Sequence, residues 1–213
     1  LYACDGGGLP NRLYVQQADG TVRDRSAEAQ VDFLEDTRSA LIIDLDNDGD
    51  QDLVVATRKL LAIHENTDGT GLNYKRILKF PQGDTSSLAA ADYDGDGLLD
   101  LYVCNYLNDS ETETVSLSDS IYNGIDGGMN RLYRNEGKLS FTDQTEATGM
   151  QVEATRMSLA ASWEDFDNDG DVDLYVANDF GPNCLYRNDK GTFTQIAPDV
   201  GADDPSTGMS ITW

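Results

Sequence analysis

Histidine is almost absent from this chain of 213 residues, since His64 is the only one. It occupies the place that Tyr14, Tyr133 and Tyr186 take in a recurring Leu-Tyr segment. We therefore expect His64 to be a substituted packing residue and not a catalytic or metal-binding one. No hydrophobic run approaches the length of a membrane span, so no membrane insertion is expected either.

Cysteine is also scarce, with only Cys4, Cys104 and Cys184. Cys4 and Cys104 align at one position of the repeat described below, whereas Cys184 lies one strand further on. Two interpretations stay open: small buried residues within strands, or a disulfide across repeats or between subunits.

Positive charge is the third shortage. The chain has 15 Lys and Arg against 39 Asp and Glu, which gives a formal net charge of -24. Nucleic acid and anionic membrane surfaces would be repelled by such a protein, so neither is expected as a partner.

Many of the acidic residues lie in three copies of one nine-residue motif. The copies are Asp44-Leu45-Asp46-Asn47-Asp48-Gly49-Asp50-Gln51-Asp52 (loop 1), Asp92-Tyr93-Asp94-Gly95-Asp96-Gly97-Leu98-Leu99-Asp100 (loop 2) and Asp165-Phe166-Asp167-Asn168-Asp169-Gly170-Asp171-Val172-Asp173 (loop 3). Carboxylates at positions 1, 3, 5 and 9 would repel one another without a cation among them, and the glycine at position 6 permits a sharp turn. A solvated hairpin turn also favours Asp-Gly, but it does not need this many carboxylates. The sequence therefore predicts three calcium loops.

Oxygen atoms alone make up the predicted ligand sets, which suits Ca²⁺ better than the smaller, octahedral Mg²⁺. We expect the ion to be bound by the side chains of positions 1, 3, 5 and 9. The backbone carbonyl of position 7 completes the set, and this position is held by Asp50, Leu98 and Asp171. The candidate residues are Asp44, Asp46, Asp48, Asp50 and Asp52; Asp92, Asp94, Asp96, Leu98 and Asp100; and Asp165, Asp167, Asp169, Asp171 and Asp173. Even three bound Ca²⁺ would neutralise only a quarter of the net charge of -24.

The residues around the loops predict strands and not the helices of an EF-hand. Position 12, where an EF-hand needs glutamate, holds Val55, Val103 and Val176. β-Branched, aromatic and apolar residues follow each loop, and short runs of small and apolar residues precede it. The repeating unit is thus a strand, a calcium loop and a second strand.

Two more elements recur after each unit. Residues 130–137 (Asn-Arg-Leu-Tyr-Arg-Asn-Glu-Gly) return at 183–191, and more weakly at 11–16 and 61–66. An alternating Phe-Thr segment follows at 139–145 and 192–196, as in a half-buried strand. Four short strands in about 45 to 50 residues match the size of a β-propeller blade. We therefore predict an all-β fold of four-stranded antiparallel blades, with a calcium loop between the first and second strands.

These residues resemble the FG-GAP or VCBS repeat, the calcium-loop β-propeller of integrin α-subunits. The likeness is closest to the propellers of ASPIC/UnbV-type proteins and cartilage acidic protein. It is carried by the three Asp loops, the Asn-x-Leu-Tyr-Arg-Asn strand, the Phe-Thr-Asp-x-Thr strand that ends in residues 147–150, and Trp163 ahead of loop 3. It implies one repeat domain over 1–213, with a partial blade at 1–35 and blades at 36–83, 84–150 and 151–205.

An insertion at 106–128 lengthens the third of these spans, and its acidic, hydroxyl-rich composition predicts a surface loop between two strands. It contains a candidate N-glycosylation site at Asn108, in Asn108-Asp109-Ser110. The insertion either contacts a partner or is plain surface decoration.

The positions at which the repeat begins and ends in this chain predict that residues 206–213 form the first strand of a blade whose other strands are missing. Residue 1 aligns just after a loop, and Trp213 aligns with Trp163, just before one. Three interpretations follow: an excerpt of a longer propeller, a propeller closed by its own last strand, or a head-to-tail filament in which that strand completes a neighbouring copy.

We expect an extracellular or cell-surface protein, because simple Asp loops suit the millimolar calcium found there. The first hypothesis is a non-catalytic calcium-binding repeat protein for adhesion, scaffolding or assembly, with a protein or glycan at the cell surface as partner. The alternatives are a self-assembling filament subunit joined through edge strands and a carbohydrate-binding or carbohydrate-active module. Arg134 and Arg187 are expected to form salt bridges or cap turns and not to bind an anionic ligand.

Overall fold

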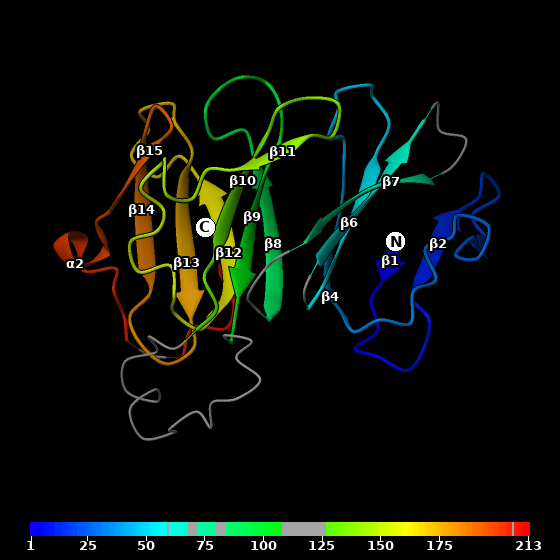
Figure 1. Cartoon of the computed structure of the whole chain (residues 1–213), viewed down its shortest axis with the longest axis horizontal. Coiled ribbons are helices and arrows are strands. Elements are labelled where there is room, and N and C mark those ends of the chain that lie inside the picture. The colour runs from blue at the N-terminus through cyan, green and yellow to red at the C-terminus, as the bar shows by residue number, and fades with distance from the viewer. Residues whose placement is uncertain (59, 68–71, 80–83, 108–126, 206) are drawn as a thin grey trace. The chain divides into compact units, whose positions relative to one another are not determined.

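A computed structural model of the chain describes residues 1–58, 60–67, 72–79, 84–107, 127–205 and 207–213. It divides into two compact units, an N-terminal unit of Leu1–Phe80 and a C-terminal unit of Pro81–Trp213. Each unit contains two antiparallel sheets, and the all-β fold predicted from the repeat is confirmed (Figure 1). Asn108 and most of the insertion lie outside the described residues.

The N-terminal unit contains a three-stranded and a four-stranded sheet, each meandering in chain order. The strands are β1 (Tyr2–Ala3), β2 (Arg12–Gln16) and β3 (Val22–Asp24), then β4 (Thr37–Ile43), β5 (Asp52–Thr57), β6 (Leu60–Asn66) and β7 (Leu72–Lys79).

The C-terminal unit contains two four-stranded sheets that lie side by side (Figure 1). The first is formed by β8 (Thr85–Ala91), β9 (Asp100–Asn105), β10 (Arg131–Asn135) and β11 (Phe141–Asp143). The second is formed by β12 (Ser158–Glu164), β13 (Asp173–Asn178), β14 (Cys184–Asp189) and β15 (Thr192–Gln195). A short helix, α2 (Ala197–Val200), follows it.

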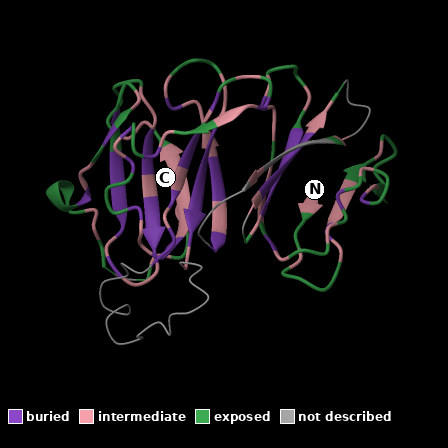
Figure 2. Cartoon of the chain, in the orientation of Figure 1, coloured by how far each residue is buried: buried purple, intermediate pink, exposed green. Residues whose placement is uncertain are grey.

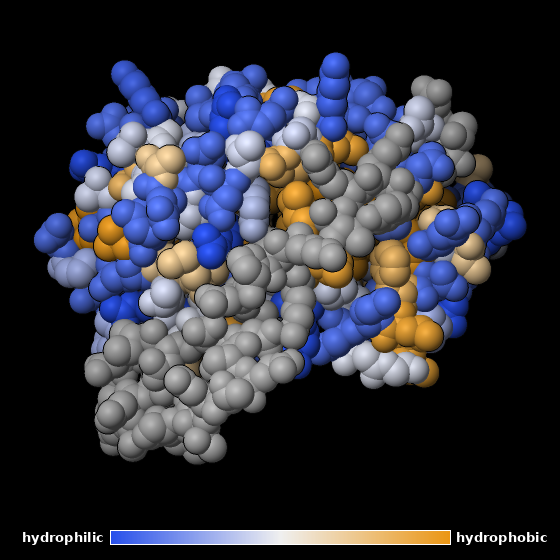
Figure 3. Space-filling view, viewed as in Figure 1, coloured by the Kyte–Doolittle hydropathy of each residue, from blue (hydrophilic) through white to orange (hydrophobic). Residues whose placement is uncertain are grey.

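The second strand of each four-stranded sheet is the most deeply buried. All six residues of β9 are buried, as are five of the six in β5 and in β13. Because successive side chains of a strand point to opposite faces of the sheet, this unbroken burial means that both faces of these strands are covered. Figure 2 shows the result, with buried residues concentrated in the strands and exposed residues in the loops. On the visible face of the C-terminal unit, hydrophilic residues predominate (Figure 3), which agrees with the net charge of -24.

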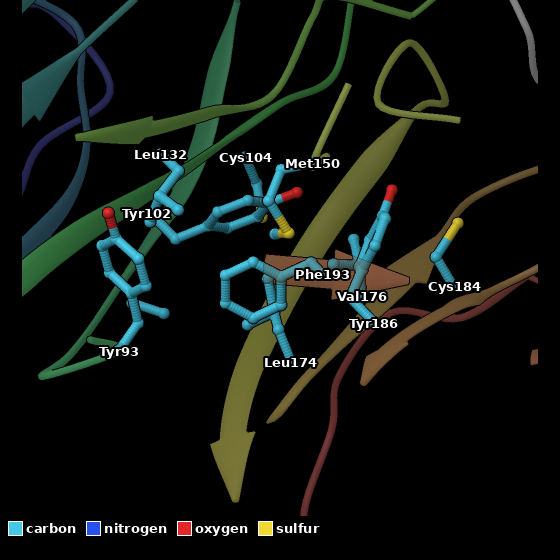
Figure 4. Packing of buried hydrophobic residues seen from close by; sticks show 11 residues of the cluster. Tyr93, Tyr102, Cys104, Leu132, Met150, Leu174, Val176, Cys184, Tyr186 and Phe193 are labelled. Atoms are coloured by element: carbon cyan, nitrogen blue, oxygen red, sulfur yellow. The ribbon is translucent and has the colours of Figure 1, made fainter. Parts of the chain in front are cut away.

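Aromatic side chains from both sheets form the core of the C-terminal unit (Figure 4). The Trp163 ring meets Tyr102 edge-on at 6.2 Å between centroids and lies 6.0 Å from Phe193. Phe193 also packs against Tyr93 of loop 2, at 5.8 Å. Each such pair adds about 0.5–1.5 kcal/mol beyond area burial, so these contacts hold the two sheets together.

Strand register confirms the alignment of His64 with two tyrosines. His64 pairs with Leu53 across β5 and β6, as Tyr133 pairs with Leu101 and Tyr186 with Leu174. The side chain is 1% exposed and packs against Phe33, with 5.4 Å between ring centroids. His64 therefore fills a core position, as expected for a packing residue.

Burial of His64 predicts a pH-dependent loss of stability. Burial lowers the pKa of His64 from 6.5 to about 4. The unfolded chain then binds a proton that the folded chain excludes, so this contribution is complete above pH 6.5 and is lost as the pH falls toward 4. We expect His64→Phe to remove it. The difference in unfolding free energy between wild type and variant should shift by about 2 kcal/mol between pH 7 and pH 4.5, measured by urea denaturation. A constant difference across this range would contradict the prediction.

Two further expectations concern residues near the chain end and the cysteines. Residues 207–213 form no strand in the structure, and Trp213 instead packs edge-on against Tyr175 at 6.0 Å. Their pairing with another blade stays a prediction.

All three cysteines are free thiols, with Cys4 exposed and with Cys104 and Cys184 buried in the core.

Candidate metal centres

The three Asp-rich loops connect the first and second strands of their sheets: loop 1 joins β4 to β5, loop 2 joins β8 to β9 and loop 3 joins β12 to β13. Each loop turns through two residues with left-handed backbone, at positions 4 and 6. The φ angles at position 4 are 60° (Asn47), 74° (Gly95) and 62° (Asn168), and at position 6 they are 94° (Gly49), 88° (Gly97) and 97° (Gly170). Asparagine and glycine tolerate this conformation best, so the loop sequence specifies the turn.

Carboxylates inside each loop are held by its own backbone. The position 1 aspartate accepts a hydrogen bond from the glycine N–H at position 6, at 3.1 Å (Asp44), 2.8 Å (Asp92) and 3.0 Å (Asp165). The position 5 aspartate accepts one from the N–H at position 7, at 2.8 Å (Asp48), 2.9 Å (Asp96) and 2.9 Å (Asp169). These bonds wrap the chain around its acidic side chains in the same way three times.

The position 9 aspartates are completely buried, each with 0% exposure. One carboxylate oxygen accepts the N–H of position 2, at 2.9 Å (Asp52), 3.2 Å (Asp100) and 3.1 Å (Asp173). The other accepts the N–H of the last or penultimate residue of the third strand, at 2.8 Å (Asn66), 2.7 Å (Asn135) and 2.7 Å (Asn188). Position 9 therefore fastens the start of its loop to the third strand, a role that the sequence did not reveal.

Burial also changes the acidity of these carboxyl groups. It raises the pKa of Asp100 to about 7 and raises those of Asp52 and Asp173, while the backbone N–H groups act in the opposite direction. An ionised carboxylate at this depth is unfavourable by itself, and a cation in the loop would offset that penalty.

Three carboxylates converge in each loop closely enough to share one ion. The groups are Asp44, Asp46 and Asp48; Asp92, Asp94 and Asp96; and Asp165, Asp167 and Asp173, with candidate ligand atoms within 4.8 Å of one another in each group. Asp44 Oδ1 and Asp94 Oδ1 are buried and have no hydrogen-bond partner among the described residues. Buried acceptors without donors, in an all-oxygen set, fit a hard divalent cation such as Ca²⁺.

The convergent groups differ from the predicted ligand sets at positions 5 and 9. Position 9 joins the group in loop 3 alone, where it replaces Asp169 of position 5. The Asp171 side chain at position 7 accepts the N–H of Lys190 at 2.9 Å. The carbonyl ligands of Asp50, Leu98 and Asp171 stay predictions.

The amide side chain at the end of the third strand was missed by the sequence reasoning. Asn188 is fully buried, and its Nδ2 donates to the carbonyl oxygens of Tyr93 (2.8 Å) and Val172 (3.0 Å). Its Oδ1 accepts the N–H of Gly191 at 2.7 Å. One side chain thus contacts loop 2 and loop 3. The recurrence of asparagine at 66, 135 and 188 was the available signal.

Removal of the Asn188 amide is expected to loosen the contact between the two sheets. Asn188→Ala leaves two carbonyl groups and one N–H without their partner, so we expect a loss of about 2 kcal/mol in unfolding free energy. Urea denaturation in calcium-containing buffer measures it. Asp189→Ala, at the next and exposed position, is the matched control and should change stability by less than about 0.5 kcal/mol. Equal losses in both variants would contradict this role.

The arginines of the third strand behave differently from one another. Arg134 forms ion pairs with Asp94, Asp96 and Glu136, so the expected salt bridges are present. Arg187 is exposed and forms no ion pair with another described residue.

A cavity of 430 Å³ in the N-terminal unit is the other candidate binding feature. Its lining is mainly apolar, including Leu13, Ile42 and Leu53, with Tyr14 as its aromatic ring. Its one carboxylate, Asp52, already accepts two backbone N–H groups. The cavity therefore offers a single aromatic ring and no unengaged carboxylate, which is a poor match to a sugar-binding site.

Comparison with known proteins identifies the repeat. The pattern of the FG-GAP-like repeat family matches residues 44–103 and 165–213, just over half of the chain. No curated protein sequence matches the chain. In the described part of the chain, no helix is both long and apolar enough to pass through a lipid bilayer.

One similar solved structure is an Agrocybe aegerita lectin that specifically recognises non-reducing terminal N-acetylglucosamine. It is 15% identical, with a TM-score of 0.51, and the match covers 94% of this chain and 48% of the lectin. The chain therefore spans about half the length of this structure, and at this identity the likeness concerns the fold alone.

Proposed function

Because the chain belongs to the FG-GAP-like repeat family, we propose that it is a calcium-stabilised part of an extracellular β-propeller that serves adhesion, scaffolding or assembly without catalysing a reaction. The observation that carries the proposal is the threefold loop geometry, with three carboxylates converging in each loop and buried acceptors in loops 1 and 2. In each loop the ion would be held by the carboxylates of its convergent group. Its charge would offset their repulsion and fix the path between the first two strands.

A non-catalytic role is supported by how the polar residues are used. In the described part of the chain, every group of three converging acidic ligands belongs to one of the loops. His64 is buried against Phe33, away from solvent. A general acid or base must reach its substrate, and these groups are engaged in folding instead.

An extracellular location is supported by the simple, exposed loops. Sites with dissociation constants above about 10 μM are filled at the millimolar calcium found outside cells and stay largely empty at submicromolar calcium. A protein or glycan at the cell surface is the proposed partner, since the net charge of -24 disfavours nucleic acid and anionic membranes. The likeness to a lectin concerns the fold alone at 15% identity, and the lining of the cavity in the N-terminal unit does not favour carbohydrate binding over this proposal.

The test is the stoichiometry and strength of calcium binding to the full chain. After removal of calcium with EGTA, equilibrium dialysis should show three Ca²⁺ per chain, with dissociation constants between about 10 μM and 1 mM. A combined Asp46→Asn, Asp94→Asn and Asp167→Asn variant should bind far less, because each loop loses one convergent carboxylate. Absence of binding at about 5 mM calcium, roughly five times the weakest expected dissociation constant, would refute the proposal. Submicromolar constants would contradict the extracellular assignment.

A further inference from the structure

One position on the third strand is acidic beside loop 1 and basic beside loops 2 and 3. It is the residue directly before the recurring asparagine, and we call it the flanking position: Glu65 in β6, Arg134 in β10 and Arg187 in β14. The three are equivalent because the preceding residues pair with Leu53, Leu101 and Leu174. The asparagine that follows each of them binds the position 9 aspartate of its own loop.

At loop 2 the flanking position supplies a cation to the calcium ligands themselves. The Arg134 Nε atom lies 2.5 Å from Asp94 Oδ2, and its Nη2 atom lies 2.7 Å from Asp96 Oδ2. The third nitrogen, Nη1, binds Glu136 at 2.9 Å, which holds the guanidinium in place. Two of the three convergent carboxylates of loop 2 are therefore already paired with a positive charge.

At loop 1 the flanking position adds negative charge. The strand register places Glu65 beside loop 1 as it places Arg134 beside loop 2, and the next residue, Asn66, donates its N–H to Asp52 of that loop at 2.8 Å. Loop 1 thus has a further carboxylate near its convergent group, where loop 2 has a guanidinium. At loop 3 Arg187 is exposed and makes no ion pair among the described residues, so its charge is screened by solvent.

We propose that the flanking position grades the calcium affinities of the loops, with Glu65 making loop 1 the tightest site and Arg134 making loop 2 the weakest. The inference rests on the proposed calcium function. A unit charge about 5 Å from a divalent ion changes its affinity by about tenfold, even at the dielectric constant of water. In loop 2, Arg134 acts as an internal cation that calcium must outcompete, and loop 3 is intermediate.

A purely positioning role of Arg134 predicts the opposite result. The guanidinium takes Oδ2 of Asp94 and leaves Oδ1 without a hydrogen-bond partner among described residues. If Arg134 served only to aim Oδ1 at the ion, its removal would weaken calcium binding at loop 2. The direction of the change therefore separates the two roles.

Hydrogen exchange measured by mass spectrometry during a calcium titration reports on each loop separately, through peptides covering 44–52, 92–100 and 165–173. In the wild-type chain the midpoint of protection should come first at loop 1, then at loop 3 and last at loop 2. Arg134→Gln should move the loop 2 midpoint to about tenfold lower calcium, and Glu65→Gln should move the loop 1 midpoint to about tenfold higher calcium. Arg187→Gln is the matched control and should move the loop 3 midpoint by less than about threefold.

A loop 2 midpoint that stays unchanged or rises in Arg134→Gln would overturn the proposal. If that variant does not fold, Glu65→Gln and Glu65→Arg decide alone, because both must raise the loop 1 midpoint and the arginine must raise it more. Protection by calcium with equal midpoints in all variants would refute the grading but leave the calcium function standing. If calcium protected none of the wild-type loops, the proposed function itself would fail.

Discussion

Removal of calcium is expected to lower the unfolding free energy of the chain by about 8 kcal/mol at 1 mM calcium, if each site binds with a dissociation constant of about 10 μM. Each site then contributes about 2.7 kcal/mol by mass action, since the ion binds the folded loop and not the unfolded chain. The total is comparable with the whole stability of a typical domain. A chain stripped of calcium should therefore be largely unfolded or marginally folded.

The structural reason is the proximity of like charges in each loop. Without an ion, three carboxylates remain with ligand atoms within 4.8 Å of one another, in a turn that leads into a buried strand. Loop 2 should be affected least, because Arg134 pairs with two of its carboxylates.

Thermal and urea unfolding with 1 mM calcium and with excess EGTA measure this effect. Magnesium at the same concentration is the control, and it should restore much less stability because it demands a smaller octahedral site. Identical unfolding curves with calcium and with EGTA would rule out a stabilising ion.

The second large effect is expected from Asp173→Ala, which should cost about 3 kcal/mol even in EGTA, measured with enough of a stabilising osmolyte such as TMAO to keep the calcium-free wild-type chain folded. Asp173 is completely buried, and its carboxylate accepts the N–H groups of Phe166 (3.1 Å) and Asn188 (2.7 Å). The substitution leaves both donors unsatisfied, at about 1–3 kcal/mol each, partly offset by the removal of a buried charge.

Asp167→Ala is the matched control within the same loop. Asp167 belongs to the same convergent group but is exposed, so its loss in EGTA should be neutral or slightly stabilising through reduced repulsion. In calcium both variants should be destabilised. Asp173→Asn, which keeps one acceptor oxygen, should recover part of the loss in EGTA. Equal behaviour of the two alanine variants in EGTA would contradict a structural role for position 9.

The strands and turns could be predicted because their determinants are local. Continuous apolar, β-branched and aromatic runs specify β5, β9 and β13, and the Asn or Gly at positions 4 and 6 specifies the turn before each of them. Because each loop recurs at the same place between its first and second strands, the four-stranded blade could be predicted as well.

The remaining features depend on contacts between residues far apart in sequence. Asn188 donates a hydrogen bond to the carbonyl oxygen of Tyr93, which lies 95 residues earlier in the sequence. Arg134 pairs with Asp94, which lies 40 residues earlier. The pattern shows that these residues recur, but it does not show which loop each one contacts. For the same reason, the buried carboxylates of position 9 resembled ordinary calcium ligands in the sequence.

The bond from Asn188 to Tyr93 also bears on how such a chain could change its length during evolution. In the C-terminal unit, the first sheet provides the carbonyl group at position 2 of its loop and the second provides the amide at the end of its third strand to the seam between them. A gene duplication or deletion of one whole repeat would add or remove both halves of such a seam together. The newly adjacent sheets would then meet through the same donor and acceptor, so the number of blades can vary without new interface chemistry.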